Sequence, residues 1–242
     1  MKIKVFKTIE EADMFAADLM AEVIKNKPNA VLGLATGSSP EGMYAELVRR
    51  HQAGDLDFSG LTTVNLDEYI GLGEEHKESY RYFMNHHLFN HVNIDPAKTH
   101  VPNGQATDLK AECKAYDELW RQLGGTDIQV LGIGPNGHIG FNEPALRLRG
   151  NTHVTQLTDN TIEANSRFFD SIDDVPTKAI TMGMDHIMKA KKLIILAFGE
   201  VKRRVISEFA NDEITSDIPV TLCKLHPDAT LIVDEVAGAD LI

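Results

Sequence analysis

The chain has 242 residues, of which 43% are hydrophobic and 25% charged, and its formal net charge is −12. This length allows one large α/β domain or two small ones, and the composition excludes a disordered or low-complexity protein. A surface this acidic repels polyanions, which argues against nucleic acid and anionic membranes as partners. A phosphorylated substrate would need a local cationic pocket that overcomes the repulsion from this negative surface.

The sequence also carries signals about the cellular compartment. The first residues, MKIKVFKTIEEAD, reach charged side chains too early for a signal peptide. The apolar run at 193–198 is far too short to span a membrane. Cys113 and Cys223 show no metal or redox spacing, which favours free thiols in a reducing compartment. We therefore expect a cytoplasmic protein.

Short apolar runs alternate with helical patterns, which is typical of βαβ units and a largely parallel sheet. Strands are predicted at residues 3–6, 30–34, 62–66, 128–133, 192–198 and 231–233. Helices are predicted at 12–24 after a Thr8/Glu11 capping box, after Pro40, at 80–91, at 108–122 before Gly124-Gly125, and after Gly199. Residues 143–176 are more polar and interrupt this rhythm. We interpret them as a lid inserted in a single α/β domain that spans 1–242.

The first candidate site is the segment Gly33-Leu34-Ala35-Thr36-Gly37-Ser38-Ser39-Pro40, between a predicted strand and a predicted helix. Small residues let a ligand approach the backbone, and a helix start offers free N–H groups and a positive dipole. It is not a Walker A loop, because no Gly-Lys-Ser/Thr follows. The segment is either an ordinary turn rich in Gly and Ser or a binding site for an anion such as phosphate.

The second candidate is Asn65-Leu66-Asp67-Glu68-Tyr69, at the predicted carboxyl end of a strand, where ligands of open α/β sheets bind. Asp67 and Glu68 are adjacent, so on an extended chain their side chains point to opposite faces. Only one of them can enter a cleft, and Asp67 shares its face with Asn65. A solvated acidic strand end remains the alternative.

The third candidate is the segment from Gly132 to Pro144, which reads GIGPNGHIGFNEP. It contains G-x-G-x-x-G, but its prolines and later glycines prevent the long helix that a dinucleotide-binding fingerprint requires. His138 is followed by Glu143 five residues later. A histidine held by a carboxylate is the usual arrangement of a general acid/base. The alternative is a glycine-rich turn with a surface histidine.

Two basic residues complete the set of candidates for a phosphate pocket. Arg167 lies in the inserted region, and Lys202 begins the helix predicted after Gly199. The alternative is that each of these residues is an ordinary surface charge in contact with solvent. His87 and His91 have i, i+4 spacing, but there is no H-E-x-x-H motif, so we expect no metal site.

Five segments together resemble the glucosamine-6-phosphate deaminase (glucosamine/galactosamine-6-phosphate isomerase) family, in family order across nearly the whole chain. They are residues 34–40, 65–69, 137–144, 165–169 and 225–227, which read LATGSSP, NLDEY, GHIGFNEP, NSRFF and LHP. The resemblance implies a Rossmann-like α/β fold, with a mostly parallel sheet flanked by helices. It also implies conversion of glucosamine 6-phosphate and water to fructose 6-phosphate and ammonia, with no metal or organic cofactor.

The resemblance implies a role for each candidate residue. His138 would open the pyranose ring, oriented by Glu143 and Asn136, and Asp67 would then carry a proton between C2 and C1. The phosphate would be held by Thr36, Gly37, Ser38, Ser39, Arg167 and Lys202.

The chain departs from the family pattern in two places. Many members have aspartate where Asn136 stands; asparagine can orient His138 but adds no charge, so we expect retained activity with a shifted pH profile. Hexameric members activated by N-acetylglucosamine 6-phosphate have basic residues in the insert and a longer C-terminal tail. Here the matching positions are Leu146, His153 and Thr155, and the sequence ends at Ile242. We therefore expect no such activation and favour a monomer; whether Arg147 and Arg149 contact a ligand stays open.

Two alternatives remain at this stage. A 6-phosphogluconolactonase, or another sugar-phosphate enzyme on a similar fold, needs no proton transfer between adjacent carbons, so Asp67 discriminates against it. A non-catalytic sugar-phosphate sensor would keep the loop at 36–39 but would not need Asp67, His138 and Glu143 together.

Overall fold

The computed structural model describes residues 1–166 and 169–241. In this part of the chain a seven-stranded sheet forms the centre, with the order β1-β10-β9-β6-β2-β3-β5 and every pair of neighbours parallel. Its strands are β1 (Lys2–Phe6), β2 (Val31–Leu34), β3 (Thr62–Asn65), β5 (Thr99–His100), β6 (Ile128–Gly132), β9 (Leu193–Ala197) and β10 (Ala229–Asp234). The predicted parallel α/β fold is confirmed. The two-residue strand β5 was not predicted, because it is too short to show a period.

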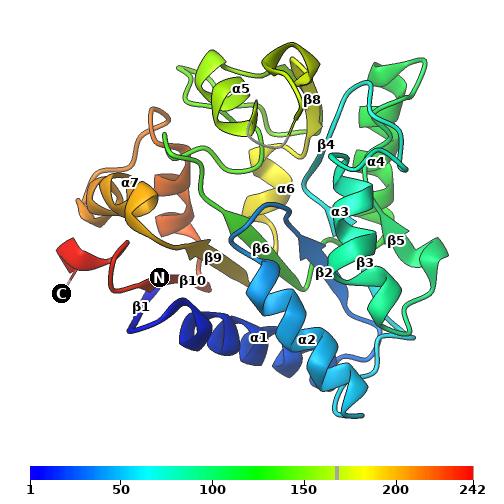
Figure 1. Cartoon of the computed structure of the whole chain (residues 1–242), viewed down its shortest axis with the longest axis horizontal. Coiled ribbons are helices and arrows are strands. Elements are labelled where there is room, and N and C mark those ends of the chain that lie inside the picture. The colour runs from blue at the N-terminus through cyan, green and yellow to red at the C-terminus, as the bar shows by residue number, and fades with distance from the viewer. Residues whose placement is uncertain (167–168, 242) are drawn as a thin grey trace.

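Helices lie on both sides of this sheet (Figure 1). They are α1 (Ile9–Asn26), α2 (Glu41–Gln52), α3 (Tyr80–His87), α4 (Leu109–Gln122), α5 (Asp159–Ser166), α6 (Met184–Met188) and α7 (Glu200–Ala210). In Figure 1, α7 lies beside the sheet end that carries β1 and β10, and α3 and α4 lie beside β3 and β5. Within the described ranges, no helix combines the length and the apolar character that a membrane span needs.

The helix predicted at 80–91 is wrong in its last turn. α3 ends at His87, and a separate 3₁₀ helix covers Phe89–His91. Leu88 between them has φ −140° and ψ −60°, outside the helical region. The apolar period continues through this break because Met84, Leu88 and Phe89 are all buried, so the sequence pattern could not reveal it.

α1 illustrates how the sequence builds the layers. The backbone N–H of Glu11 donates to Thr8 Oγ1 at 3.2 Å, and Glu11 Oε2 accepts from the N–H of Lys7 rather than that of Thr8. The predicted capping box is therefore present with its return bond shifted by one residue. The buried face of α1 is rich in alanine, and these small side chains let the helix lie close to the strands and to α2.

Asp13, on α1, packs against the first turn of α2. A Cβ atom at Gly42 would lie only 1.8 Å from Asp13 Oδ2, so this approach requires glycine. Burial raises the pKa of Asp13 from 3.8 to about 6, although a hydrogen bond from the backbone of Met43 opposes the shift. The ionised carboxylate is therefore destabilised in the folded state.

This shift predicts a pH-dependent stability. Because the folded pKa of Asp13 lies above the unfolded one, folding is favoured when the group is protonated, and stability falls as pH rises from 3.8 through about 6. Asp13→Asn should raise the unfolding free energy at neutral pH by about 1–3 kcal/mol. Thermal unfolding of both proteins across this range measures the gain. A gain that persists unchanged below pH 3.8 would contradict the assignment to Asp13.

A second, three-stranded antiparallel sheet lies at one side of the main sheet, with α5 beside it (Figure 1). Its order is β4 (Asp67–Tyr69), β8 (Lys178–Thr181) and β7 (His153–Gln156). Of these three strands the insert predicted at 143–176 supplies β7, together with α5 and a 3₁₀ helix at Ile172–Asp174, so the unit extends beyond the predicted bounds at both ends. Its action as a lid stays a prediction.

The chain passes from one sheet to the other at Leu66. The N–H of Leu66 donates to Leu34 O of the main sheet at 3.1 Å, and its carbonyl accepts from Met182 N at 2.7 Å. The sequence placed Asp67 at the end of a strand of the main sheet, and this prediction is wrong. Asp67 begins a strand of the small sheet, opposite Thr181.

The strand order changes direction between β2 and β6. From β2 the chain builds outward through β3 and β5, and from β6 it builds the other way through β9 and β10. Loops that leave adjacent parallel strands in opposite directions open a crevice at the carboxyl ends of the strands. The segments that follow β2 and β6 are the Gly/Ser segment and the histidine-containing loop.

Candidate active site

A cavity of about 950 Å³ occupies this crevice. Five parts of the chain form most of its walls: the segment after β2, the start of β4, the loop after β6, helix α3 and the first turn of α7. It brings together Thr36, Gly37, Ser38, Ser39, Asp67, Asn136, His138 and Lys202. These residues are scattered over much of the sequence, and the fold places them around one space.

Asp67 lies at the inner end of this cavity. Only 6% of the residue is exposed. Burial is the main reason why the pKa of Asp67 is raised well above its usual range, and the neighbouring charge of Glu68 adds to the effect. A carboxyl group with a raised pKa is a stronger base once ionised, which suits proton abstraction from carbon.

Glu68 points away from the cavity, as the alternation of a strand requires. Its carboxylate accepts hydrogen bonds from the backbone N–H groups of Tyr80 and Arg81, both at 2.9 Å. It therefore holds the first turn of α3, which forms one wall of the site. Of the two adjacent acids, only Asp67 lines the cavity.

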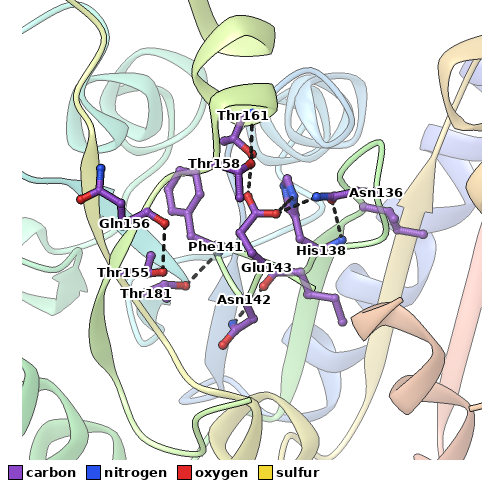
Figure 2. Close-up of polar contacts among 12 residues, drawn as sticks. Asn136, His138, Phe141, Asn142, Glu143, Thr155, Gln156, Thr158, Thr161 and Thr181 are labelled. Atoms are coloured by element: carbon purple, nitrogen blue, oxygen red, sulfur yellow. Dashed lines mark hydrogen bonds and ion pairs between the residues drawn. The ribbon is translucent and has the colours of Figure 1, made fainter. Parts of the chain in front are cut away.

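His138 and Glu143 face each other across the loop after β6 (Figure 2). His138 Nδ1 lies 3.2 Å from Glu143 Oε2. Asn136 donates from Nδ2 to the same carboxylate oxygen at 2.7 Å, and its Oδ1 accepts from the backbone N–H of His138 at 3.3 Å. Since Nδ1 faces the carboxylate, Nε2 is the ring nitrogen left to act on a bound molecule.

The other oxygen of Glu143 accepts a hydrogen bond from Thr161 Oγ1 at 2.5 Å (Figure 2). Burial by itself would raise the pKa of Glu143. The contact with His138 and the hydrogen bonds from Thr161 and Asn136 outweigh burial and lower this pKa to about 2. Glu143 is thus a fixed negative charge at neutral pH, suited to orienting His138 and stabilising its protonated form.

The loop between β2 and α2 has the geometry of an anion site. Gly37 has φ +91°, a conformation that favours glycine, and α2 begins at Glu41, directly after Pro40. Lys202 comes from the first turn of α7, lines the cavity and donates from Nζ to Ile133 O at 2.5 Å. Arg167 lies outside the described residues. The cavity thus brings a helix start and the cation of Lys202 together with Asp67 and His138.

Comparison with known proteins places this arrangement in a family. The family of glucosamine-6-phosphate isomerases/6-phosphogluconolactonase matches residues 7–232. The chain belongs to this family. It is 56% identical over 238 residues to a Clostridium perfringens (strain 13 / Type A) protein named glucosamine-6-phosphate deaminase, with 98% of each chain covered.

Solved structures agree with the sequence comparison. A monomeric glucosamine-6-phosphate deaminase matches with a TM-score of 0.97 and 46% identity, covering 99% of this chain and 100% of that one. A 6-phosphogluconolactonase from Trypanosoma brucei matches with a TM-score of 0.80 at 18% identity, covering 100% and 98%. The second match shows the shared fold alone. The glucosamine-6-phosphate isomerase/6-phosphogluconolactonase family thus accounts for the whole architecture.

Within this family fold, an aromatic wall beside Asp67 was not predicted. Tyr69, Tyr80, Phe141 and Phe169 line the cavity. The Tyr69 ring centroid lies 4.8 Å from that of Tyr80 and 5.6 Å from that of Phe141. Tyr69 and Phe141 lie within the motifs at 65–69 and 137–144, which is the signal that could have indicated them. The wall keeps water from Asp67 and contributes to its raised pKa.

Other residues considered from the sequence lie elsewhere. Arg147, Arg149, His153 and Thr155 line a separate cavity of about 250 Å³ beside β7. Cys113 and Cys223 are buried free thiols. In the ranges 1–166 and 169–241 no three His, Cys, Asp or Glu residues are grouped as a metal site would require. The expected absence of a metal therefore stays a prediction.

Proposed function

We propose that the chain is a glucosamine-6-phosphate deaminase that releases fructose 6-phosphate and ammonia from glucosamine 6-phosphate and water. The observation that carries this proposal is that Asp67, His138 and the Gly/Ser loop line one cavity, with Glu143 3.2 Å from His138 Nδ1. The names of the relatives with 46–56% identity support it. Water is consumed as in a hydrolase, although the sugar is also isomerised.

Ring opening would be the task of His138. Nε2 takes the proton from the anomeric hydroxyl group and returns a proton to the ring oxygen as the C1–O5 bond breaks. During this transfer the imidazolium is stabilised by Glu143, 3.2 Å from Nδ1. Asn136 orients both groups through hydrogen bonds but adds no charge. We therefore expect activity with a pH profile shifted from that of family members with aspartate at this position.

Asp67 would then move a proton between carbon atoms. The carboxylate removes the C2 proton of the open-chain aldehyde, the electrons move through the C1–C2 bond to the carbonyl oxygen, and this oxygen takes a proton from solvent to give an enolamine with a C1 hydroxyl group. The same carboxyl returns the C2 proton to C1, which leaves an iminium group at C2. Water adds to C2, ammonia leaves and one proton returns to solvent, giving the ketone of fructose 6-phosphate. One base can serve both carbons because they are adjacent.

The phosphate of the substrate would bind at the start of α2. Thr36, Gly37, Ser38 and Ser39 offer backbone N–H groups and hydroxyl groups near a positive helix end. Lys202 adds a cation, and we propose that Arg167 adds a second. Such a local site overcomes the repulsion expected from a net charge of −12.

We further propose a cytoplasmic monomer that N-acetylglucosamine 6-phosphate does not activate. Leu146, His153 and Thr155 occupy the positions where activated members carry basic residues, and one matching structure is a monomeric deaminase. Buried free thiols suit a reducing compartment. Sigmoidal kinetics relieved by the N-acetylated sugar phosphate would contradict this proposal.

The deciding experiment is an assay of the purified chain with glucosamine 6-phosphate, measuring both ammonia and fructose 6-phosphate. We expect the two products in equal amounts, without added metal. Release of 6-phosphogluconate from its lactone with no ammonia would favour the lactonase alternative. Binding of the sugar phosphate without turnover would favour a sensor.

A further inference from the structure

One contact of Glu143 comes from outside the loop that carries His138. Thr161 lies on α5, in the small-sheet unit, and its Oγ1 donates to Glu143 Oε1 at 2.5 Å. The other oxygen, Oε2, faces His138 and Asn136. Because each carboxylate oxygen has its own partner, the carboxylate plane is fixed at both ends.

Thr161 is in turn held by Thr158 (Figure 2). Thr158 Oγ1 lies 3.0 Å from Thr161 Oγ1 and accepts from the backbone N–H of Thr161 at 3.3 Å. The single hydroxyl proton of Thr161 is used on the ionised Glu143. The proton between the two hydroxyl groups must therefore come from Thr158, which gives a directed chain from Thr158 through Thr161 to Glu143.

We propose that Thr161 is a positioning residue for ring opening: it fixes the Glu143 carboxylate against His138 and connects this pair to α5. The proposal rests on the deaminase function proposed above. Thr161 is 6% exposed and lines the cavity, so its hydroxyl group is shielded from competing water. A shielded hydrogen bond to a carboxylate is stronger than an exposed one.

Loss of the hydroxyl group has two expected consequences. Glu143 can rotate away from His138 Nδ1, and misplacement of this kind lowers turnover by about 10- to 100-fold. One of the contacts that keep the pKa of Glu143 near 2 also disappears. The pKa of Glu143 should therefore rise, but the acid limb of the pH profile should stay where the raised pKa of Asp67 sets it. The KM for glucosamine 6-phosphate should change little, because the phosphate loop is untouched.

The experiment compares Thr161→Val, which keeps the shape but removes the hydroxyl group, with Thr161→Ser, which retains it. kcat and KM are measured across pH for ammonia release. We expect Thr161→Val to lower kcat with little change in KM, and Thr161→Ser to restore most of the lost kcat. Thr155→Val is the matched control, because this hydroxyl group donates to Gln156 O at 3.4 Å rather than to Glu143; it should leave the kinetics unchanged.

Thr158→Val separates positioning from simple damage to α5. It removes both hydrogen bonds between Thr158 and Thr161 but leaves the Thr161–Glu143 contact, so we expect a smaller loss of kcat than in Thr161→Val. A Thr158→Val variant that reproduces the full Thr161→Val effect would overturn the proposal. So would a Thr161→Val variant with the kcat of the unaltered chain.

A second readout does not depend on turnover. The ring-nitrogen chemical shifts of His138, followed by NMR, should change in Thr161→Val and not in Thr155→Val. Unchanged shifts in Thr161→Val would overturn the positioning role even if the enzyme is active. If the unaltered chain releases no ammonia, the deaminase proposal fails, whereas changed shifts would still show that Thr161 acts on His138.

Discussion

Replacing Asp67 with asparagine is expected to lower kcat for ammonia release about 10³-fold while leaving ligand binding nearly intact. The amide has almost the same shape as the carboxyl group but cannot take a proton from C2. Asp67 is buried and lines the same cavity as the loop before α2, but the phosphate would bind to the backbone N–H groups and hydroxyl groups of that loop rather than to Asp67. Calorimetric titration with fructose 6-phosphate measures binding, and a coupled ammonia assay measures turnover.

The pH dependence of the unaltered enzyme tests the same residue. Burial, with the charge of Glu68, raises the pKa of Asp67 well above its usual range. As pH falls through this raised pKa the carboxylate is protonated and can no longer act as a base. The acid limb of kcat/KM should therefore lie above the range of an ordinary aspartate.

One result would redirect the whole assignment. If Asp67→Asn keeps full turnover while His138→Ala abolishes it, no proton moves between C2 and C1, and hydrolysis of a lactone becomes the better proposal. Glu68→Gln is a useful comparison, because Glu68 holds the first turn of α3 and does not line the cavity. Glu68→Gln should lower the stability of the fold more than it lowers kcat.

The sequence predicted most of the main sheet well, because its central strands are short apolar runs buried on both faces. β9 and β10 are buried along their entire lengths, and that burial leaves a continuous apolar signal. The small sheet left no such signal. β4 has three residues, two of them acidic, and its partners β7 and β8 lie far away in the sequence. Only long-range pairing distinguishes β4 from the end of β3.

The candidate site was predictable to the extent that its chemistry lies in short motifs. Asp67, His138 and Glu143 each stand in a dense polar segment at a strand end, and dense polarity is hard to explain by packing. Thr161 shows the limit of this approach. It is a common residue in a short helix. It lies 18 residues from Glu143 in the sequence, and the two side chains meet because of the fold. The aromatic wall was missed for a similar reason, because aromatic residues are usually assigned to a core.

Replacing His138 with glutamine is expected to lower kcat about 10²-fold by slowing ring opening rather than proton transfer at carbon. Glutamine can still donate and accept hydrogen bonds, but it cannot exchange a proton near neutral pH. The Glu143 carboxylate, with a pKa of about 2, would then face a partner that carries no charge. Ring opening should become the slowest step.

An isotope experiment separates these two steps. With glucosamine 6-phosphate deuterated at C2, proton abstraction by Asp67 is slowed, so an enzyme limited by that step shows a kinetic isotope effect. His138→Gln should show a smaller isotope effect than the unaltered chain, because ring opening now limits the rate before C2 reacts. His153→Gln is the matched control, since His153 lies on β7 and lines the other cavity. A His138→Gln variant that keeps both the full isotope effect and the original kcat would remove His138 from the ring-opening step.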